Sequence, residues 1–134
     1  MANAVYPKWK EAVIQASSDS ALTGNVKAVL VDLADYTYSS AHDFLDDVPA
    51  GARVATSGNL ASKTYTNGTF DTADFTFTAV TGDVSEAIIL YIDTGTASTS
   101  RLVAFLDTGV TGLPVTPNGG DITVTVPSWF TLGS

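Results

Sequence analysis

The segments Ala87–Gly95 (AIILYIDTG) and Arg101–Gly109 (RLVAFLDTG) decide the fold class of this chain. In each of them, a short and almost unbroken apolar run ends in the turn-forming residues Asp-Thr-Gly. Runs of this length bounded by turn residues are typical of buried β-strands, whereas helices need longer periodic segments. The sequence therefore predicts strands over Ala87–Ile92 and Arg101–Leu106.

Strand-like segments extend on both sides of this pair, from Val26 to Val126. The almost continuously apolar Val26–Val31 predicts a central strand that is covered on both faces. Alternation of apolar residues with threonine predicts strands over Phe70–Ala79 and Asp121–Val126, and Arg53–Thr56 predicts a further one. About seven short strands separated by turn residues predict a mainly β chain, with a single antiparallel β-sandwich or barrel-like domain.

The clearest hairpin signal is Asn67-Gly68, because both central residues of a tight primed turn need positive φ. We expect this turn to join Lys63–Thr66 to the strand Phe70–Ala79. A short helix is expected near residues 40–48, with Ser39 or Ser40 as its N-cap.

The first residues differ from the rest of the chain. Pro7 is tolerated in the first turn of a helix, and Trp9, Val13 and Ala16 would share one helical face. We therefore expect an N-terminal arm or short helix over residues 1–24, which packs on its own domain or reaches a neighbouring subunit. The β-sandwich domain would cover residues 25–134.

Composition excludes several classes of partner. The net charge is −8, and six Lys and Arg residues are scattered along the chain, so no basic stripe for nucleic acid is expected. The apolar run Ala87–Ile92 is far shorter than the roughly 20 residues of a transmembrane helix, so we expect no membrane contact. No signal peptide is expected, because Lys8, Lys10 and Glu11 interrupt the N-terminal segment.

The two Asp-Thr-Gly sequences, at Asp93 and Asp107, match the local motif of aspartic proteases, which need two carboxylates that share one proton. The motifs flank a single strand and should lie at its opposite ends, so only a homodimer could pair them. The structural interpretation is that Asp and Gly form turns after strands.

His42 has acidic neighbours at Asp43, Asp46 and Asp47, but no nucleophile elbow accompanies it and the spacing of the helix-loop calcium motif is absent. We expect a helix-surface histidine beside a solvated acidic face. The sequence thus predicts no catalytic, cofactor-binding or metal-binding residues.

The aromatic residues near the two ends suggest an interface. Pro127 should end the preceding strand, which leaves Trp129, Phe130 and Leu132 as an apolar tail. Together with Trp9, these residues form the predicted interface, because tryptophan is a favoured anchor. The alternative is that the tail folds back onto its own sandwich.

Six segments from Val26 onward carry a family resemblance: Lys27–Asp32, Ala41–Leu45, Val48–Ala55, Phe70–Asp74, Gly82–Ala87 and Gly112–Val124. Together they resemble small virion structural proteins of tailed bacteriophages, either capsid decoration (cement) proteins or proteins of the head–tail module. The resemblance implies a role in the head, neck or tail and brings no catalytic residues. The chain departs from the family at Val126–Leu132, which replaces a Trp-Asp-Asn-Gly type turn.

The expected function is that of a capsid decoration protein, which stabilises the head shell through non-covalent contacts. The alternatives are a tail or neck component, a glycan-binding accessory for receptor recognition that uses Tyr36, Tyr38 and Tyr65, and a dimeric aspartic protease. The expected partners are the major capsid protein or other virion proteins. We also expect a homo-oligomer such as a trimer, or a monomer until the chain meets the shell. The location would be the virion, assembled in the cytoplasm of a host bacterium.

Overall fold

The structure is a computed structural model, and it describes residues 3–14, 24–125 and 128–131. It is mainly β, as predicted, and its antiparallel sheets are not closed into a barrel. The described strands are β1 (Ala4–Val5), β2 (Asn25–Val31), β3 (Arg53–Thr56), β4 (Thr69–Phe70), β5 (Phe75–Phe77), β6 (Ala87–Asp93), β7 (Arg101–Leu106), β8 (Ile122–Val124) and β9 (Phe130–Thr131). The described helices are α1 (Pro7–Ile14) and the 3-10 helices η1 (Leu45–Asp47), η2 (Ala50–Ala52), η3 (Thr66–Gly68) and η4 (Ala97–Thr99).

A five-stranded antiparallel sheet with the order β1-β7-β6-β2-β3 forms the centre of the fold. The strands predicted at 26–31, 53–56, 87–92 and 101–106 are confirmed to within one residue. Every residue from Ala87 to Ile92 is buried, as is every residue from Leu102 to Leu106. The apolar runs are therefore continuous because both faces of these strands are covered.

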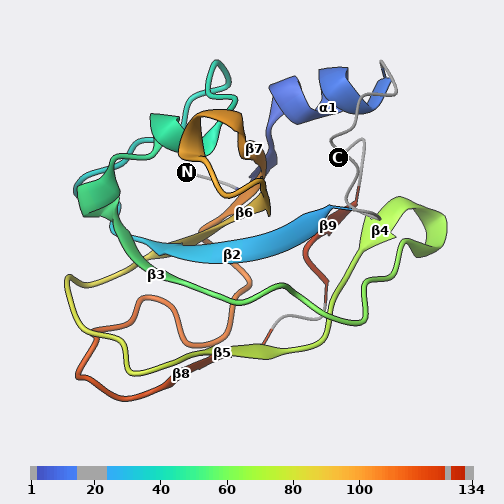
Figure 1. Cartoon of the computed structure of the whole chain (residues 1–134). Helices are drawn as coiled ribbons and strands as arrows, with labels where there is room; N and C mark the ends of the chain where they lie inside the picture. Colours follow the sequence, from blue (N-terminus) through green and yellow to red (C-terminus); the bar gives the residue numbers. More distant parts are fainter. Residues whose placement is uncertain (1–2, 15–23, 126–127, 132–134) are drawn as a thin grey trace.

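Figure 1 shows which elements cover the two faces of this sheet. The helix α1 lies on one face with the 3-10 helices η1 and η4, and the β5–β8 pair lies on the other. The β4–β9 pair lies near one end of the sheet. This layered arrangement agrees with a sandwich-like domain. Within the described part of the chain, no helix is long and apolar enough to cross a membrane.

The N-terminal segment is part of this fold. Its strand β1 pairs with the edge of β7, where Ala4 lies opposite Phe105. The β6–β7 register shifts after Leu90, which leaves Val103 as an extra residue, and the Val103 carbonyl accepts the Tyr6 N–H at 2.9 Å. A β-bulge thus attaches the start of the chain to the sheet.

The face that α1 buries differs from the predicted one. Trp9 and Ala12 are buried, whereas Val13 is 37% exposed. Ala16 lies outside the described residues. The helix begins at Pro7 as predicted, but its buried residues are three apart instead of four.

The helix predicted near 40–48 is wrong in extent, because only the single turn η1 forms there. The predicted cap is also wrong: Ser39 Oγ accepts the Ala41 N–H in a local turn at 3.2 Å. The Asp47 carboxylate instead accepts the Asp43 N–H at 2.8 Å. Serine and aspartate side chains compete with helix formation in this way by bonding to nearby backbone.

The predicted backbone conformation of the hairpin turn is confirmed, but the predicted pairing of the two strands is wrong. Asn67 and Gly68 both have positive φ, at 55° and 78°. However, the two sides meet at only one bridge, between Thr64 and Asp71. The strand predicted over Phe70–Ala79 is divided into β4 and β5, since these short strands pair with β9 and β8 from the C-terminal part of the chain.

Candidate functional site

The predicted interface at the chain ends is a set of aromatic residues packed within the domain. We call Trp9, Phe70, Phe75, Trp129 and Phe130 the terminal aromatic cluster. Trp9 meets Phe130 edge-on with ring centroids 5.6 Å apart, and Phe130 also contacts Phe70 at 5.5 Å. Only 5% of Trp9 and 3% of Trp129 is exposed, so the expectation of an exposed tryptophan tail is wrong. Leu132 lies outside the described residues.

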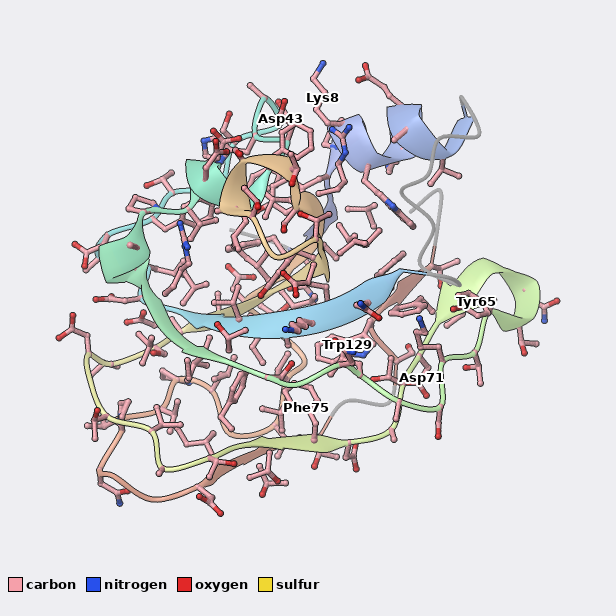
Figure 2. The ribbon with its side chains drawn as sticks, viewed as in Figure 1. Lys8, Asp43, Tyr65, Asp71, Phe75 and Trp129 are labelled. Atoms are coloured by element: carbon pink, nitrogen blue, oxygen red, sulfur yellow. The ribbon has the colours of Figure 1, made fainter. Side chains whose placement is uncertain are left out.

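Trp129 has a complete set of partners inside the domain. Its indole N–H donates to Thr72 Oγ1 at 2.9 Å, and its ring stacks on Phe75 at 5.9 Å. Its backbone N–H donates to the Phe70 carbonyl at 2.9 Å. Figure 2 shows Trp129 and Phe75 in the space between β2 and β5. Residues 128–131 therefore fold back onto their own domain, which is the alternative that the sequence left open.

A cavity of about 200 Å³ lies beside the terminal aromatic cluster. It is lined by residues 3–5 around β1, residues 104–106 of β7 and residues 129–131 around β9. Both ends of the chain thus contribute to one cavity at the edge of the main sheet. Phe130 is half-buried and lines this cavity, so it is the described member of the predicted interface that retains partial exposure.

The second cluster is polar and joins Tyr6, which directly precedes α1, to Tyr36 and His42 in the segment before η1. The Tyr6 hydroxyl is 2.7 Å from the Tyr36 hydroxyl, which is 2.8 Å from His42 Nδ1. The Tyr38 ring packs on the Tyr6 ring at 5.1 Å. Burial and the neighbouring tyrosines raise the pKa of Tyr6, and burial raises the pKa of Tyr36 to about 12. Both hydroxyls are therefore neutral at physiological pH.

His42 is wrongly predicted as a helix-surface residue. It lies in the turn before η1, half-buried, and its ring is in contact with the Tyr36 ring at 5.4 Å. Tyr36 is only six residues from His42, but its other hydrogen-bonding partner, Tyr6, is 30 residues away, so no local pattern indicates the whole arrangement. A single histidine near tyrosines is the only signal that could have suggested it.

Two acidic residues next to His42 differ in their proton affinity. Burial, followed by the hydrogen bond that the Asp43 carboxyl donates to the Asp47 carboxylate, raises the pKa of Asp43. Burial alone would raise the pKa of Asp47, but the Asp43 N–H, the Asp43 carboxyl and the Phe44 N–H outweigh it and lower that pKa. The pair therefore holds its first proton on Asp43 and keeps Asp47 ionised as a backbone cap.

The two Asp-Thr-Gly motifs lie at opposite ends of β7, as predicted. Ile92 pairs with Arg101 and Ile88 with Leu106, so Asp93 and Asp107, which each lie one residue beyond these pairs, are separated by roughly 20 Å at about 3.3 Å per residue. One chain thus cannot bring the two carboxylates together. Each motif has a structural role in its own chain.

Asp93 stabilises a turn and carries an ion pair. Its carboxylate accepts the Gly95 N–H at 3.1 Å and lies 3.0 Å from Lys27 Nζ. The turn at Asp107 is held by Asn3, whose side-chain oxygen accepts the Asp107 N–H at 2.8 Å and the Thr108 N–H at 3.0 Å. These contacts support the structural interpretation of both motifs.

Replacing Asp93 by asparagine should lower stability at neutral pH by about 0.5–1 kcal/mol, because the Lys27 ion pair is lost while an acceptor for the Gly95 N–H remains. The Gly95 N–H and Lys27 lower the pKa of Asp93 in the folded state. Its stabilisation is therefore present above the ordinary Asp pKa of about 4 and is lost as pH falls through the lower folded value. Denaturant unfolding of both proteins over this range measures the difference. An equal difference at neutral and strongly acidic pH would contradict the ion-pair account.

One group of carboxylates could hold a cation. Carboxylate oxygens of Asp32, Asp35 and Asp83 lie within 4.8 Å of one another, and hard cations such as Ca²⁺ prefer such ligands. Asp32 is 6% exposed and its Oδ1 accepts the Ala34 N–H at 2.9 Å. Since this contact is a local turn and the other two residues are exposed, we assign no metal site here.

The three tyrosines considered for glycan binding do not form one surface. Tyr36 is buried against His42, and Tyr38 is half-buried against Phe105. Tyr65, at 38% exposure, packs near Phe70 at the far end of the fold. Figure 2 shows Tyr65 beside the β4 region and away from Asp43, which lies just before η1. No protein-family model and no curated protein matches this chain.

Proposed function

We propose that this chain is a structural protein of a tailed-bacteriophage particle, specifically a capsid decoration protein that stabilises the head shell through non-covalent contacts. The observation that carries the proposal is the family resemblance, together with where its segments lie. They supply most of β2, the 3-10 helix η2 with most of β3, and the strand β8. The resembling residues therefore belong to the framework of the domain.

The contacts of the chemically reactive side chains support a structural role. His42 bonds to Tyr36, Asp93 binds Lys27 and Asp47 caps backbone N–H groups. These groups are used to hold loops and turns on the sheet. The attachment to the major capsid protein would involve Phe130 and the mouth of the adjacent cavity, because Trp9 and Trp129 are buried.

Quantitative mass spectrometry of purified particles, combined with a map of the virion, tests this proposal. A decoration protein should be present in a fixed ratio to the major capsid protein and should be distributed over the head. It should also rebind to heads that lack it, as a monomer or a small symmetric oligomer. A single ring of copies at one vertex would instead identify a neck or tail component, and absence from particles would overturn the proposal.

A further inference from the structure

Tyr6, Tyr36 and His42 form a linear hydrogen-bonded chain, which we call the Tyr–Tyr–His chain. Its two contacts measure 2.7 Å between the hydroxyls and 2.8 Å to His42 Nδ1. Tyr6 is fully buried and Tyr36 is 3% exposed, whereas His42 is half-buried. Solvent protons can therefore enter this chain at His42.

The number of hydrogens available for the two contacts of the Tyr–Tyr–His chain indicates which protonation state of His42 fits them. With His42 neutral and its proton on Nε2, two hydroxyl hydrogens serve two contacts. Tyr6 donates to Tyr36, and Tyr36 donates to His42 Nδ1. Each of the two buried hydroxyls then donates its hydrogen to an acceptor. Counting the hydrogens thus favours the Nε2–H tautomer of His42, because it is the neutral form that leaves neither hydroxyl hydrogen unused.

A proton added to His42 breaks this match, because three hydrogens must then share two contacts. Nδ1–H has to donate to the Tyr36 oxygen. Either the Tyr36 or the Tyr6 hydroxyl hydrogen is then left without an acceptor in a buried position. An unsatisfied buried hydroxyl costs about 1–3 kcal/mol.

Charged groups around His42 act on the same equilibrium. Asp47 and the protonated His42 ring attract each other, and Asp43 lies beside Asp47. From β7, the Arg101 guanidinium lies 4.3 Å from the Phe44 ring and interacts with Asp43. Tyr38 packs on Tyr6 and on Phe105 of β7. The Asp47 carboxylate favours the charged ring, and the positive charge of Arg101 opposes it.

We propose that His42 is a proton-sensitive switch for the N-terminal segment, residues 3–14, through the Tyr–Tyr–His chain. Tyr6 connects the switch to this segment. Its N–H donates to the Val103 carbonyl at 2.9 Å, and its carbonyl accepts the Trp9 N–H at 3.0 Å. When His42 is neutral, the hydrogen bonds of the Tyr–Tyr–His chain hold Tyr6 in place. When His42 is charged, the stranded hydroxyl weakens the attachment of β1 and α1 to the sheet.

The direction of the pH dependence depends on whether His42 binds its proton at a lower free-energy cost in the folded or in the unfolded protein. In the unfolded chain all three groups are hydrated, so His42 takes up its proton without stranding a hydroxyl. The unfolded or detached state therefore binds more protons, and the stability of the N-terminal segment falls as pH falls.

Amide hydrogen exchange in the full chain tests the switch, with the variant His42→Asn as matched control. Asparagine retains an acceptor near the position of Nδ1 and does not titrate. Between about pH 8 and pH 5, we expect the opening equilibrium at the Tyr6 N–H to rise roughly tenfold in the unmodified chain, after correction for intrinsic exchange. The amides that pair β2 with β6 should change less, and the variant should show no such rise. Equal pH dependence in both proteins would overturn the proposal.

A measurement on the unmodified chain alone decides the same question if the variant does not fold. ¹⁵N spectra of the imidazole at about pH 8 should show the proton on Nε2 and an unprotonated Nδ1. On acidification, the appearance of Nδ1–H should coincide with increased exchange at Tyr6. A proton on Nδ1 at about pH 8, or acidification without a change at Tyr6, would refute the switch.

Discussion

Replacing Trp129 by alanine should lower the free energy of unfolding by about 3–5 kcal/mol. The side chain is 3% exposed, stacks on Phe75 and donates to Thr72. Removing it leaves a cavity between the main sheet and the β5–β8 pair, and it also frees Thr72 from its donor. Because many domains are stable by only about 5–15 kcal/mol, this loss is a large part of the total. Urea unfolding followed by circular dichroism measures it.

Tyr65→Ala is the matched control, since Tyr65 is an aromatic residue of the same region that is 38% exposed. Its replacement should cost about 1 kcal/mol or less. If Trp129→Ala is too unstable to measure, Thr72→Val provides a second variant, because it leaves the indole N–H without an acceptor and should cost about 1–3 kcal/mol. Full stability of Trp129→Ala, combined with lost attachment to a partner, would restore the idea of an adhesive tail.

The central sheet could be predicted because its strands are defined by local apolar runs. Val26–Val31 and Arg101–Leu106 each form a strand with ends within one residue of the prediction. Both strands are covered on two faces, so every position needs an apolar residue and the signal is strong. The same reasoning placed the Asp-Thr-Gly turns at opposite ends of β7.

The short strands could not be predicted to the same extent, because their partners are distant in sequence. Thr69 pairs with Thr131, and Phe75 pairs with Val124. A two- or three-residue strand contains too little periodicity to be recognised, and its extent depends on the partner. The alternation in Phe70–Ala79 indicated extended structure, but it did not show that β5 ends at Phe77 or that Ala79 has a φ of 49°.

The candidate sites depend on contacts that no local pattern contains. Trp129 and its partner Thr72 are 57 residues apart, and Tyr6 and Tyr36 are 30 residues apart. The sequence identified the terminal aromatic residues as unusual but could not decide whether they face a partner or the core. An apolar tail after a proline is compatible with both arrangements. Which of these arrangements forms depends on the space between the main sheet and the β5–β8 pair. This space exists only in the folded chain.

Replacing Trp9 by alanine should lower the free energy of unfolding by about 3–5 kcal/mol, which is as large an effect as the loss of Trp129. Trp9 is 5% exposed and meets Phe130 edge-on at 5.6 Å. It is the residue through which α1 contacts the C-terminal part of the terminal aromatic cluster. Its loss should therefore loosen both ends of the chain, and proteolysis should first cut near the termini.

Val13→Ala is the control for this prediction, because Val13 lies on the same helix and is 37% exposed. That substitution should change stability by about 0.5 kcal/mol or less. Measuring Trp9→Ala, Phe130→Ala and the double variant gives the coupling between the two rings, which should be about 0.5–1.5 kcal/mol for an edge-to-face pair. A coupling near zero, with Trp9→Ala as stable as Val13→Ala, would mean that the N-terminal helix does not pack on its own domain in solution. The N-terminal arm would then be free to reach a neighbouring subunit, as the sequence also allowed.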